Sequence, residues 1–216
     1  MELKGIKMAC LGDSITEGGC ASRPENRHVD VMQRKYALAQ ARNYGISGTR
    51  IARQRVTYLD PNFDRDFCSR YSAMDPDADI IVVFGGTNDY GHGDAPMGTA
   101  SDRTPETFTG ACHYLFSRLP GQFPDAKIVI LTPLHRSDEN TPKGEAGWVL
   151  RDYVQVIRDT AAVYSLPVLD LFETSAIRGN DPQIAARLTA DGLHPNDLGH
   201  EILAGEIGTF LEGLPE

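Results

Sequence analysis

The chain has 216 residues, of which 41% are hydrophobic and 24% are charged, and its formal net charge is −9. A chain of this length can bury a large core, so we expect residues 1–216 to form a single domain. The acidic balance argues against nucleic acid or an anionic membrane as a partner. No apolar run approaches the roughly 18 residues that would span a bilayer, and no export signal opens the sequence, so we expect a cytoplasmic protein.

Five apolar segments predict strands. Ile80 to Phe84 is the most distinct of them, since an uninterrupted β-branched run is typical of a strand covered on both faces. An earlier run from Ile6 to Leu11 stops abruptly at a glycine, as a buried strand does when it enters a turn. The expected strands cover residues 6–11, a segment that ends at 43–48, and residues 80–84, 127–131 and 167–171.

Helices are expected between these strands. Thr104 and Pro105 fit the N-cap and the first position of one helix. The expected helices cover residues 29–40, 51–58, 104–115, 148–164 and 197–211, with helix and loop over 173–190 and long polar loops at 89–101 and 134–147. Residues 49–77 are the least regular part of the chain. Strands that alternate with helices predict an α/β fold with a mostly parallel sheet and helices on both faces.

No cofactor or metal is expected. The histidines show no spacing typical of metal ligands, and the glycines match neither common phosphate-binding motif. The four cysteines lack CxxC spacing and are expected to be free thiols. Cys10 and Cys112 lie in apolar patterns and are expected in the core.

Three strand ends carry residues of chemical interest: Ser14 after the first, Gly48 after the second and Asn88 after the third. The carboxyl ends of parallel strands are where open α/β sheets bind ligands. A serine there becomes a nucleophile if a neighbour takes its proton. Each residue also has a plainer interpretation, Ser14 as a helix cap and the other two as turn residues.

A late segment supplies the missing proton acceptor. Asp191 and His194 are three residues apart, a spacing that lets the carboxylate accept from one ring nitrogen while the other faces a serine hydroxyl. The same segment also fits a simple turn that Asn196 caps into the last helix. The order Ser, Gly, Asn, Asp-His, with each group at a strand end or in a late loop, favours the catalytic interpretation.

These segments together resemble the SGNH (GDSL-type) hydrolase family of serine esterases. The matching blocks are Gly12-Asp13-Ser14-Ile15-Thr16, Asn43 to Gly48, Gly85-Gly86-Thr87-Asn88-Asp89 and Asp191-Gly192-Leu193-His194-Pro195. The resemblance implies a flavodoxin-like three-layer α/β/α fold with a parallel sheet of about five strands. It also implies that Ser14 is the nucleophile, His194 the base and Asp191 its orienting acid. The oxyanion hole would be formed by the N–H groups of Ser14 and Gly48 and the amide of Asn88.

Further residues border these blocks. Asp13 and Asp89 are expected to accept hydrogen bonds that stabilise the turns. His92 and His135 lie in expected loops at the carboxyl edge and are candidates for the substrate rim. His113 and His200 fall on expected helices and are assigned structural or surface positions.

The motifs leave the substrate open. Polar loops favour a short acyl ester, such as an acetylated carbohydrate or metabolite, because a long acyl chain would need apolar surface. The alternatives are a lysophospholipase or thioesterase and, from another class, a non-catalytic module that binds a carbohydrate or another ligand. The oligomeric state is left open.

Overall fold

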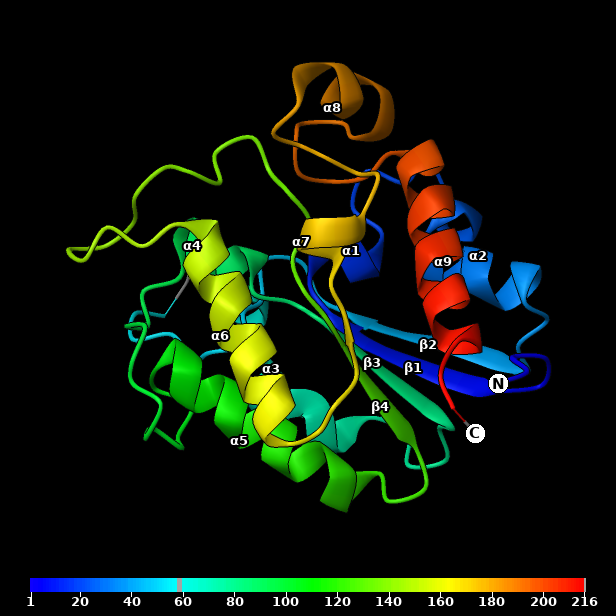
Figure 1. The fold of residues 1–216 in the computed structure, drawn as a ribbon, viewed down its shortest axis with the longest axis horizontal. Coiled ribbons are helices and arrows are strands. Elements are labelled where there is room, and N and C mark those ends of the chain that lie inside the picture. Colours follow the sequence, from blue (N-terminus) through cyan, green and yellow to red (C-terminus); the bar gives the residue numbers. More distant parts are fainter. Residues whose placement is uncertain (58–59, 216) are drawn as a thin grey trace.

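The computed structural model describes residues 1–57 and 60–215. These residues form a five-stranded sheet in the order β2-β1-β3-β4-β5, and every neighbouring pair is parallel (Figure 1). The strands are β1 (Lys7–Gly12), β2 (Gln40–Gly45), β3 (Ile80–Phe84), β4 (Lys127–Leu131) and β5 (Val168–Leu169). The expected parallel α/β sheet is thus confirmed.

Helices alternate with the strands along the chain. The α-helices are α1 (Ser14–Glu17), α2 (His28–Lys35), α3 (Phe67–Arg70), α4 (Thr87–His92), α5 (Phe108–Gln122), α6 (Leu150–Val163), α7 (Leu171–Thr174), α8 (Pro182–Leu188) and α9 (Asp197–Glu212). The described residues also form three short 3₁₀ helices, η1 (Pro24–Asn26), η2 (Pro61–Asp64) and η3 (Tyr71–Ala73).

The sheet separates two hydrophobic clusters. Side chains alternate between the faces of a strand, so Leu11 and Val83 belong to the cluster shared with α3, α5 and α6. Their neighbours Cys10 and Val82 belong to the cluster shared with α2 and α9. Figure 1 shows α2 and α9 on one face and α3, α5 and α6 on the other. This is the expected three-layer α/β/α arrangement.

The strand order places a topological switch point at β1. The chain passes from β1 to β2 on one side and then returns to β3 on the other. Crevices at the carboxyl ends of such strands are where doubly wound sheets bind ligands, and the order 2-1-3-4-5 is the flavodoxin-like one. Ser14 directly follows β1, and Asn88 lies just after β3.

The expected helix at 51–58 is wrong for the residues described, since 51–57 form bends and an irregular segment; Tyr58 lies outside them. The N–H groups of Ile51 and Ala52 bond to the Asp89 carboxylate, which replaces helical partners. The short elements η2, α3 and η3 occupy the following part of this region.

Helix boundaries also differ from expectation. The expected helix at 29–40 ends at Lys35, and Ala37 adopts a left-handed φ of 50°. The expected cap at Thr104 is replaced by Thr107, whose hydroxyl accepts from the Gly110 N–H at 3.1 Å. The Phe108 N–H meanwhile bonds to the Pro96 carbonyl, so a contact with a distant segment sets this helix start.

Candidate active site

Ser14 stands at the first turn of α1, directly after β1. The side chain of Asp13 caps this helix by accepting the Ile15 N–H at 3.0 Å. The N–H groups of a helix's first turn have no partner within the helix, so the Ser14 N–H is available to an external acceptor. The Ser14 side chain is nearly buried, as its residue is only 9% exposed.

Asp191 and His194 lie in the segment between α8 and α9. The Asp191 carboxylate accepts from the backbone N–H of Leu193 at 3.0 Å and of His194 at 2.8 Å. Its second oxygen lies 2.7 Å from Nδ1 of the His194 ring. Burial alone would raise the pKa of Asp191, but these hydrogen bonds outweigh it, and the pKa is lowered. The carboxylate therefore stays charged and fixes the ring.

The other nitrogen of His194 reaches the serine. Nε2 of His194 lies 2.9 Å from Oγ of Ser14, although 180 residues separate them in the chain. Because Asp191 holds the proton on Nδ1, Nε2 presents its lone pair to the Ser14 hydroxyl. This arrangement can take the proton of Ser14 and stabilise the resulting imidazolium.

The segment that bears His194 has several supports. The Ala190 N–H bonds to the His194 carbonyl at 2.9 Å, and the Ser137 N–H bonds to the Gly192 carbonyl at 3.0 Å. Asn196 caps α9 by accepting the Gly199 N–H at 3.0 Å. The capping interpretation of this segment is therefore also correct, since the same turn begins the last helix and positions Asp191 and His194.

Gly48 lies beyond the end of β2 with a left-handed φ of 74°. A Cβ built on Gly48 would lie 2.5 Å from the Phe63 ring, so both conformation and space require glycine. Nη1 of the buried Arg50 donates to the carbonyls of Gly48 at 3.1 Å and Phe63 at 2.9 Å. The Gly48 turn is therefore fixed by a cation that the sequence patterns did not indicate.

Asn88 lies on the short helix α4, where we had expected a turn that leads into the loop at 89–101. Gly86, with φ 103°, redirects the chain directly after β3 and allows α4 to start at Thr87. The Asn88 amide donates from Nδ2 to the Thr49 carbonyl at 3.0 Å. This bond places the side chain beside the Gly48 turn.

Arg70 joins the carboxyl ends of β1 and β2. Its guanidinium donates to the Gly12 carbonyl at 2.6 Å, to the Tyr44 carbonyl and to the Thr49 hydroxyl at 3.1 Å. Burial lowers the pKa of Arg70 to about 10, which still leaves it charged at neutral pH. Arg70 connects residues far apart in the sequence, and no local pattern singles it out.

The two expected turn acceptors differ in their partners. Asp13 acts locally, as a helix cap, whereas Asp89 reaches across to Ile51 and Ala52. Burial raises the pKa of Asp13 to about 6 and that of Asp89 to about 7, against the hydrogen bonds and cations that favour the charged form.

The two candidate rim histidines occupy different environments. His92 lies partly exposed on α4, and its Nε2 lies 3.1 Å from Oδ1 of Asn88. His135 is only 7% exposed, and its Nδ1 pairs with the Glu139 carboxylate at 2.7 Å while the ring packs on Phe172. His92 is thus placed beside Asn88, while His135 belongs to a buried network rather than an open rim.

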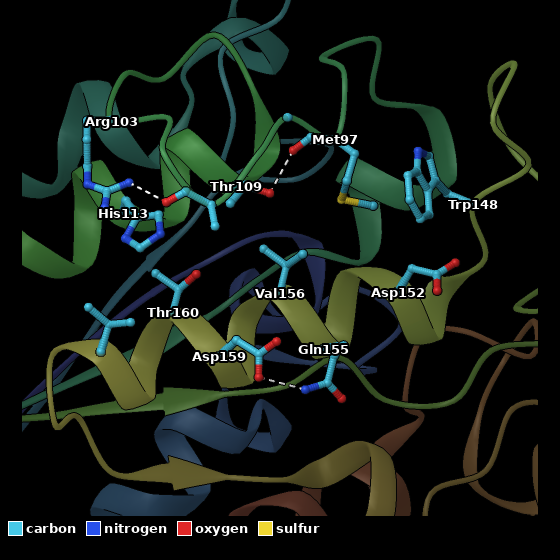
Figure 2. A pocket seen from close by; sticks show the side chains of 13 residues that line it. Met97, Arg103, Thr109, His113, Trp148, Asp152, Gln155, Val156, Asp159 and Thr160 are labelled. Carbon is cyan, nitrogen blue, oxygen red and sulfur yellow. Dashed lines mark hydrogen bonds between the residues drawn. The ribbon is translucent and has the colours of Figure 1, made fainter.

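A separate cavity of about 440 Å³ opens between α6 and the segment that leads into α5 (Figure 2). Met97, Val156 and the half-exposed Trp148 contribute apolar surface, with Arg103 and Asp159 among the charged residues of its lining. Neither Ser14 nor His194 lines it.

Two further histidines, His113 and His200, are buried. Cys10 and Cys112 are also buried, as expected for core residues. All four cysteines are free. Within residues 1–57 and 60–215, no helix combines the length and apolarity needed to cross a bilayer.

Comparison with known proteins decides the family. The model of the GDSL-like Lipase/Acylhydrolase family matches residues 10–202. The chain belongs to this family. A GDSL lipase of Mycobacterium tuberculosis is 29% identical over 213 residues, covering 94% of this chain and 80% of its own length.

Solved structures share the fold. A protein from Lactobacillus plantarum superposes with a TM-score of 0.84 at 30% identity, over 99% of both chains. A possible lipase from Chitinophaga pinensis has a TM-score of 0.72 at 19% identity, over 96% of this chain and 98% of its own. At that identity the second likeness shows the shared fold alone. The GDSL-like family comprises lipases and acylhydrolases, so this chain is a GDSL-family acylhydrolase.

Proposed function

We propose that the protein is a serine ester hydrolase that works through an acyl-enzyme. The observation that carries the proposal is the continuous chain from Ser14 Oγ through both nitrogens of His194 to the Asp191 carboxylate. A neutral serine is a weak nucleophile, and an oriented imidazole is the group that activates it. This complete set of groups favours catalysis over a role in ligand binding alone.

The first half of the reaction forms the acyl-enzyme. Ser14 Oγ attacks the carbonyl carbon of the ester while its proton passes to Nε2 of His194, and the carbonyl oxygen becomes an oxyanion. His194 then returns the proton to the departing alcohol as the tetrahedral intermediate collapses. In the second half, a water molecule gives a proton to His194 and attacks the acyl carbon. The carboxylic acid leaves, and the proton returns to Ser14.

We assign three donors to the oxyanion. They are the backbone N–H groups of Ser14 and Gly48 and the Asn88 amide. One N–H of that amide already bonds to Thr49, so the second N–H is the one assigned to the oxyanion. Donors that are already oriented stabilise the developing charge without reorganisation cost, which is the main source of their effect on rate.

We assign a short acyl group on a polar alcohol, such as an acetylated carbohydrate or metabolite, to this site. The Phe63 ring packs directly on Gly48 and limits the space beside that donor. The 440 Å³ cavity beside α6 has apolar surface that suits a longer chain, but neither Ser14 nor His194 lines it. A lysophospholipid or a thioester remains the alternative substrate class.

The test compares p-nitrophenyl esters of increasing chain length on wild type, Ser14→Ala and Ser117→Ala. Ser117 is exposed on α5, far from β1 in the chain, and serves as the matched serine control. We expect hydrolysis to fall by roughly 10⁴-fold or more in Ser14→Ala alone, with acetate the preferred acyl group in wild type. A serine-directed phosphonate should label Ser14. Retained turnover in a folded Ser14→Ala protein would refute the mechanism.

A further inference from the structure

A cysteine lies beside the catalytic histidine and its aspartate. Cys20 is exposed and follows α1 by way of Gly18 and Gly19. One ligand atom from each of Cys20, Asp191 and His194 lies within 4.8 Å of the other two. The sequence did not indicate this group, because Cys20 lies far from the other two residues in the chain.

The position of Cys20 is set by its surroundings. A Cβ built on Gly19 would lie 3.2 Å from Cδ2 of His194, so this segment passes directly along the imidazole ring. The Gly19 carbonyl lies 3.3 Å from Nε2 of His200, a buried residue on α9. Because a carbonyl only accepts, Nε2 of His200 is the donor. The backbone that leads into Cys20 is therefore held beside the ring.

The other cysteines are unsuited to metal binding. Cys10, Cys68 and Cys112 are buried, and burial raises their thiol pKa, that of Cys10 to about 12. Cys20 is the exposed cysteine of the four and the one grouped with a carboxylate and an imidazole.

A thiolate, an imidazole and a carboxylate are the ligand types that Zn²⁺ takes in proteins, and three protein ligands leave its fourth position for water. We propose that Cys20, Asp191 and His194 form a Zn²⁺ site whose occupation reversibly inhibits the enzyme. This inference rests on the proposed function only for the inhibition, since the binding itself depends on the geometry of the three side chains.

Inhibition follows from the chemistry of the imidazole. A metal on Nε2 would take the lone pair that must accept the proton of Ser14. A metal on Nδ1 would leave the single ring proton on Nε2, which faces Ser14 Oγ at 2.9 Å. In either case His194 has no free lone pair for the serine, and the nucleophile is not activated.

Binding must also release a proton. The thiolate, and not the thiol, is the form of cysteine that binds a metal, and an ordinary thiol is protonated at neutral pH. One proton leaves Sγ as the sulfur–zinc bond forms, while the imidazole stays neutral and the carboxylate stays charged. No oxidant or reductant takes part. The affinity for Zn²⁺ should therefore increase as the pH rises.

The first experiment measures binding without reference to hydrolysis. Zinc chloride is titrated calorimetrically into metal-free wild type, Cys20→Ser and Ser14→Ala, and Co²⁺ replaces Zn²⁺ for absorption spectra. We expect one Zn²⁺ per chain in wild type and Ser14→Ala, with a thiolate-to-cobalt charge-transfer band in the near ultraviolet. Cys20→Ser should lose this band and bind at least about 100-fold more weakly, because loss of a mere hydrogen-bond partner of a ligand already costs 10–100-fold.

The second experiment measures ester hydrolysis against zinc concentration. Each variant is compared with its own rate after EDTA treatment, so any change in basal rate in Cys20→Ser cancels. Wild type should be inhibited and recover with EDTA, and Cys20→Ser should lose this sensitivity although it keeps the other three cysteines. Equal zinc affinity in wild type and Cys20→Ser, or a cobalt adduct without the thiolate band, would overturn the site.

The two proposals fail separately. Zinc binding that depends on Cys20 in a protein without esterase activity would refute the proposed function and leave the site intact. Esterase activity that depends on Ser14 but resists zinc would refute the inhibitory site and leave the function intact.

Discussion

Both polar atoms of the Asn88 side chain are hydrogen-bonded, and His92 is the partner of one of them. Nδ2 of Asn88 must face the Thr49 carbonyl, which can only accept, and this leaves Oδ1 facing Nε2 of His92 at 3.1 Å. His92 therefore carries its proton on Nε2. Partial burial and the positive charges of Arg50 and Arg136 lower the pKa of His92 to about 4, so the ring is neutral at physiological pH.

Loss of the Asn88 amide tests the assigned oxyanion donor. In Asn88→Ala we expect kcat to fall roughly 10²–10³-fold with little change in KM, because the oxyanion exists fully only in the transition state. The measurement is kcat and KM per titrated active site, alongside the thermal midpoint. A lower midpoint with unchanged kcat would assign Asn88 to the turn alone.

His92 is expected to act through Asn88. His92→Phe should lower kcat by less than the roughly 10²–10³-fold of full donor loss, since the amide remains but loses one of its two fixed orientations. His92→Gln retains an N–H donor and should restore most of the rate. If the two variants have equal rates, the hydrogen bond to Asn88 has no part in positioning the amide.

Arg70 should matter for stability. Arg70→Met removes a buried cation and leaves the Gly12 and Tyr44 carbonyls without this donor, so we expect the free energy of unfolding to fall by about 2–4 kcal/mol. Arg118→Met is the control, because Arg118 is exposed on α5 and should change stability by no more than about 0.5 kcal/mol. Denaturant unfolding curves measure both, and similar losses in the two variants would contradict the role given to Arg70.

The sequence was informative where chemistry follows local structure. Ser14 could be placed at the carboxyl edge of the sheet, because it directly follows an apolar strand that ends at a glycine and all strands of a parallel sheet end at that edge. The spacing of Asp191 and His194 likewise described a real contact within one turn. Boundaries were less predictable: Thr104 and Thr107 both suit a helix cap, and the bond from Phe108 to Pro96 decides between them.

Long-range partners could not be predicted. Asp89 seemed a turn residue, yet its carboxylate fixes Ile51 and Ala52 in a region where we expected a helix. Cys20 gave no signal of its own, because its neighbours Asp191 and His194 come from the far end of the chain. Such contacts depend on how the layers pack, and no local pattern of residue types records them.

Two buried histidines should make stability depend on pH. His28 on α2 and His200 on α9 stack with ring centroids 5.6 Å apart, and the backbone N–H of His28 donates to Nδ1 of His200 at 3.3 Å. Burial, together with the neighbouring ring, lowers the pKa of His28 well below its ordinary value. Burial also lowers the pKa of His200, helped by His194 and Arg27, although the bond to Gly19 and the charge of Asp197 oppose this effect.

The sign of the effect follows from proton uptake. Below the ordinary histidine pKa of about 6.5, these two rings bind protons in the unfolded chain but stay neutral in the folded protein. The contribution of the two histidines to the free energy of unfolding therefore falls as the pH drops. Asp13 and Asp89 act in the opposite direction, because burial raises their pKa to about 6 and about 7 and the folded state then holds the extra protons. In wild type, the slope of the free energy of unfolding against pH is therefore a sum of opposing contributions. A variant that lacks one histidine is needed to separate them.

The comparison is between wild type and His28→Gln, which removes one titrating ring and keeps a polar side chain. Between about pH 6.5 and pH 5, the free energy of unfolding of wild type should fall more steeply, by up to about 1.4 kcal/mol per pH unit, which is the value for one proton. Denaturant unfolding at several pH values gives both slopes. If the two proteins keep a constant difference across this range, His28 does not resist protonation in the folded state.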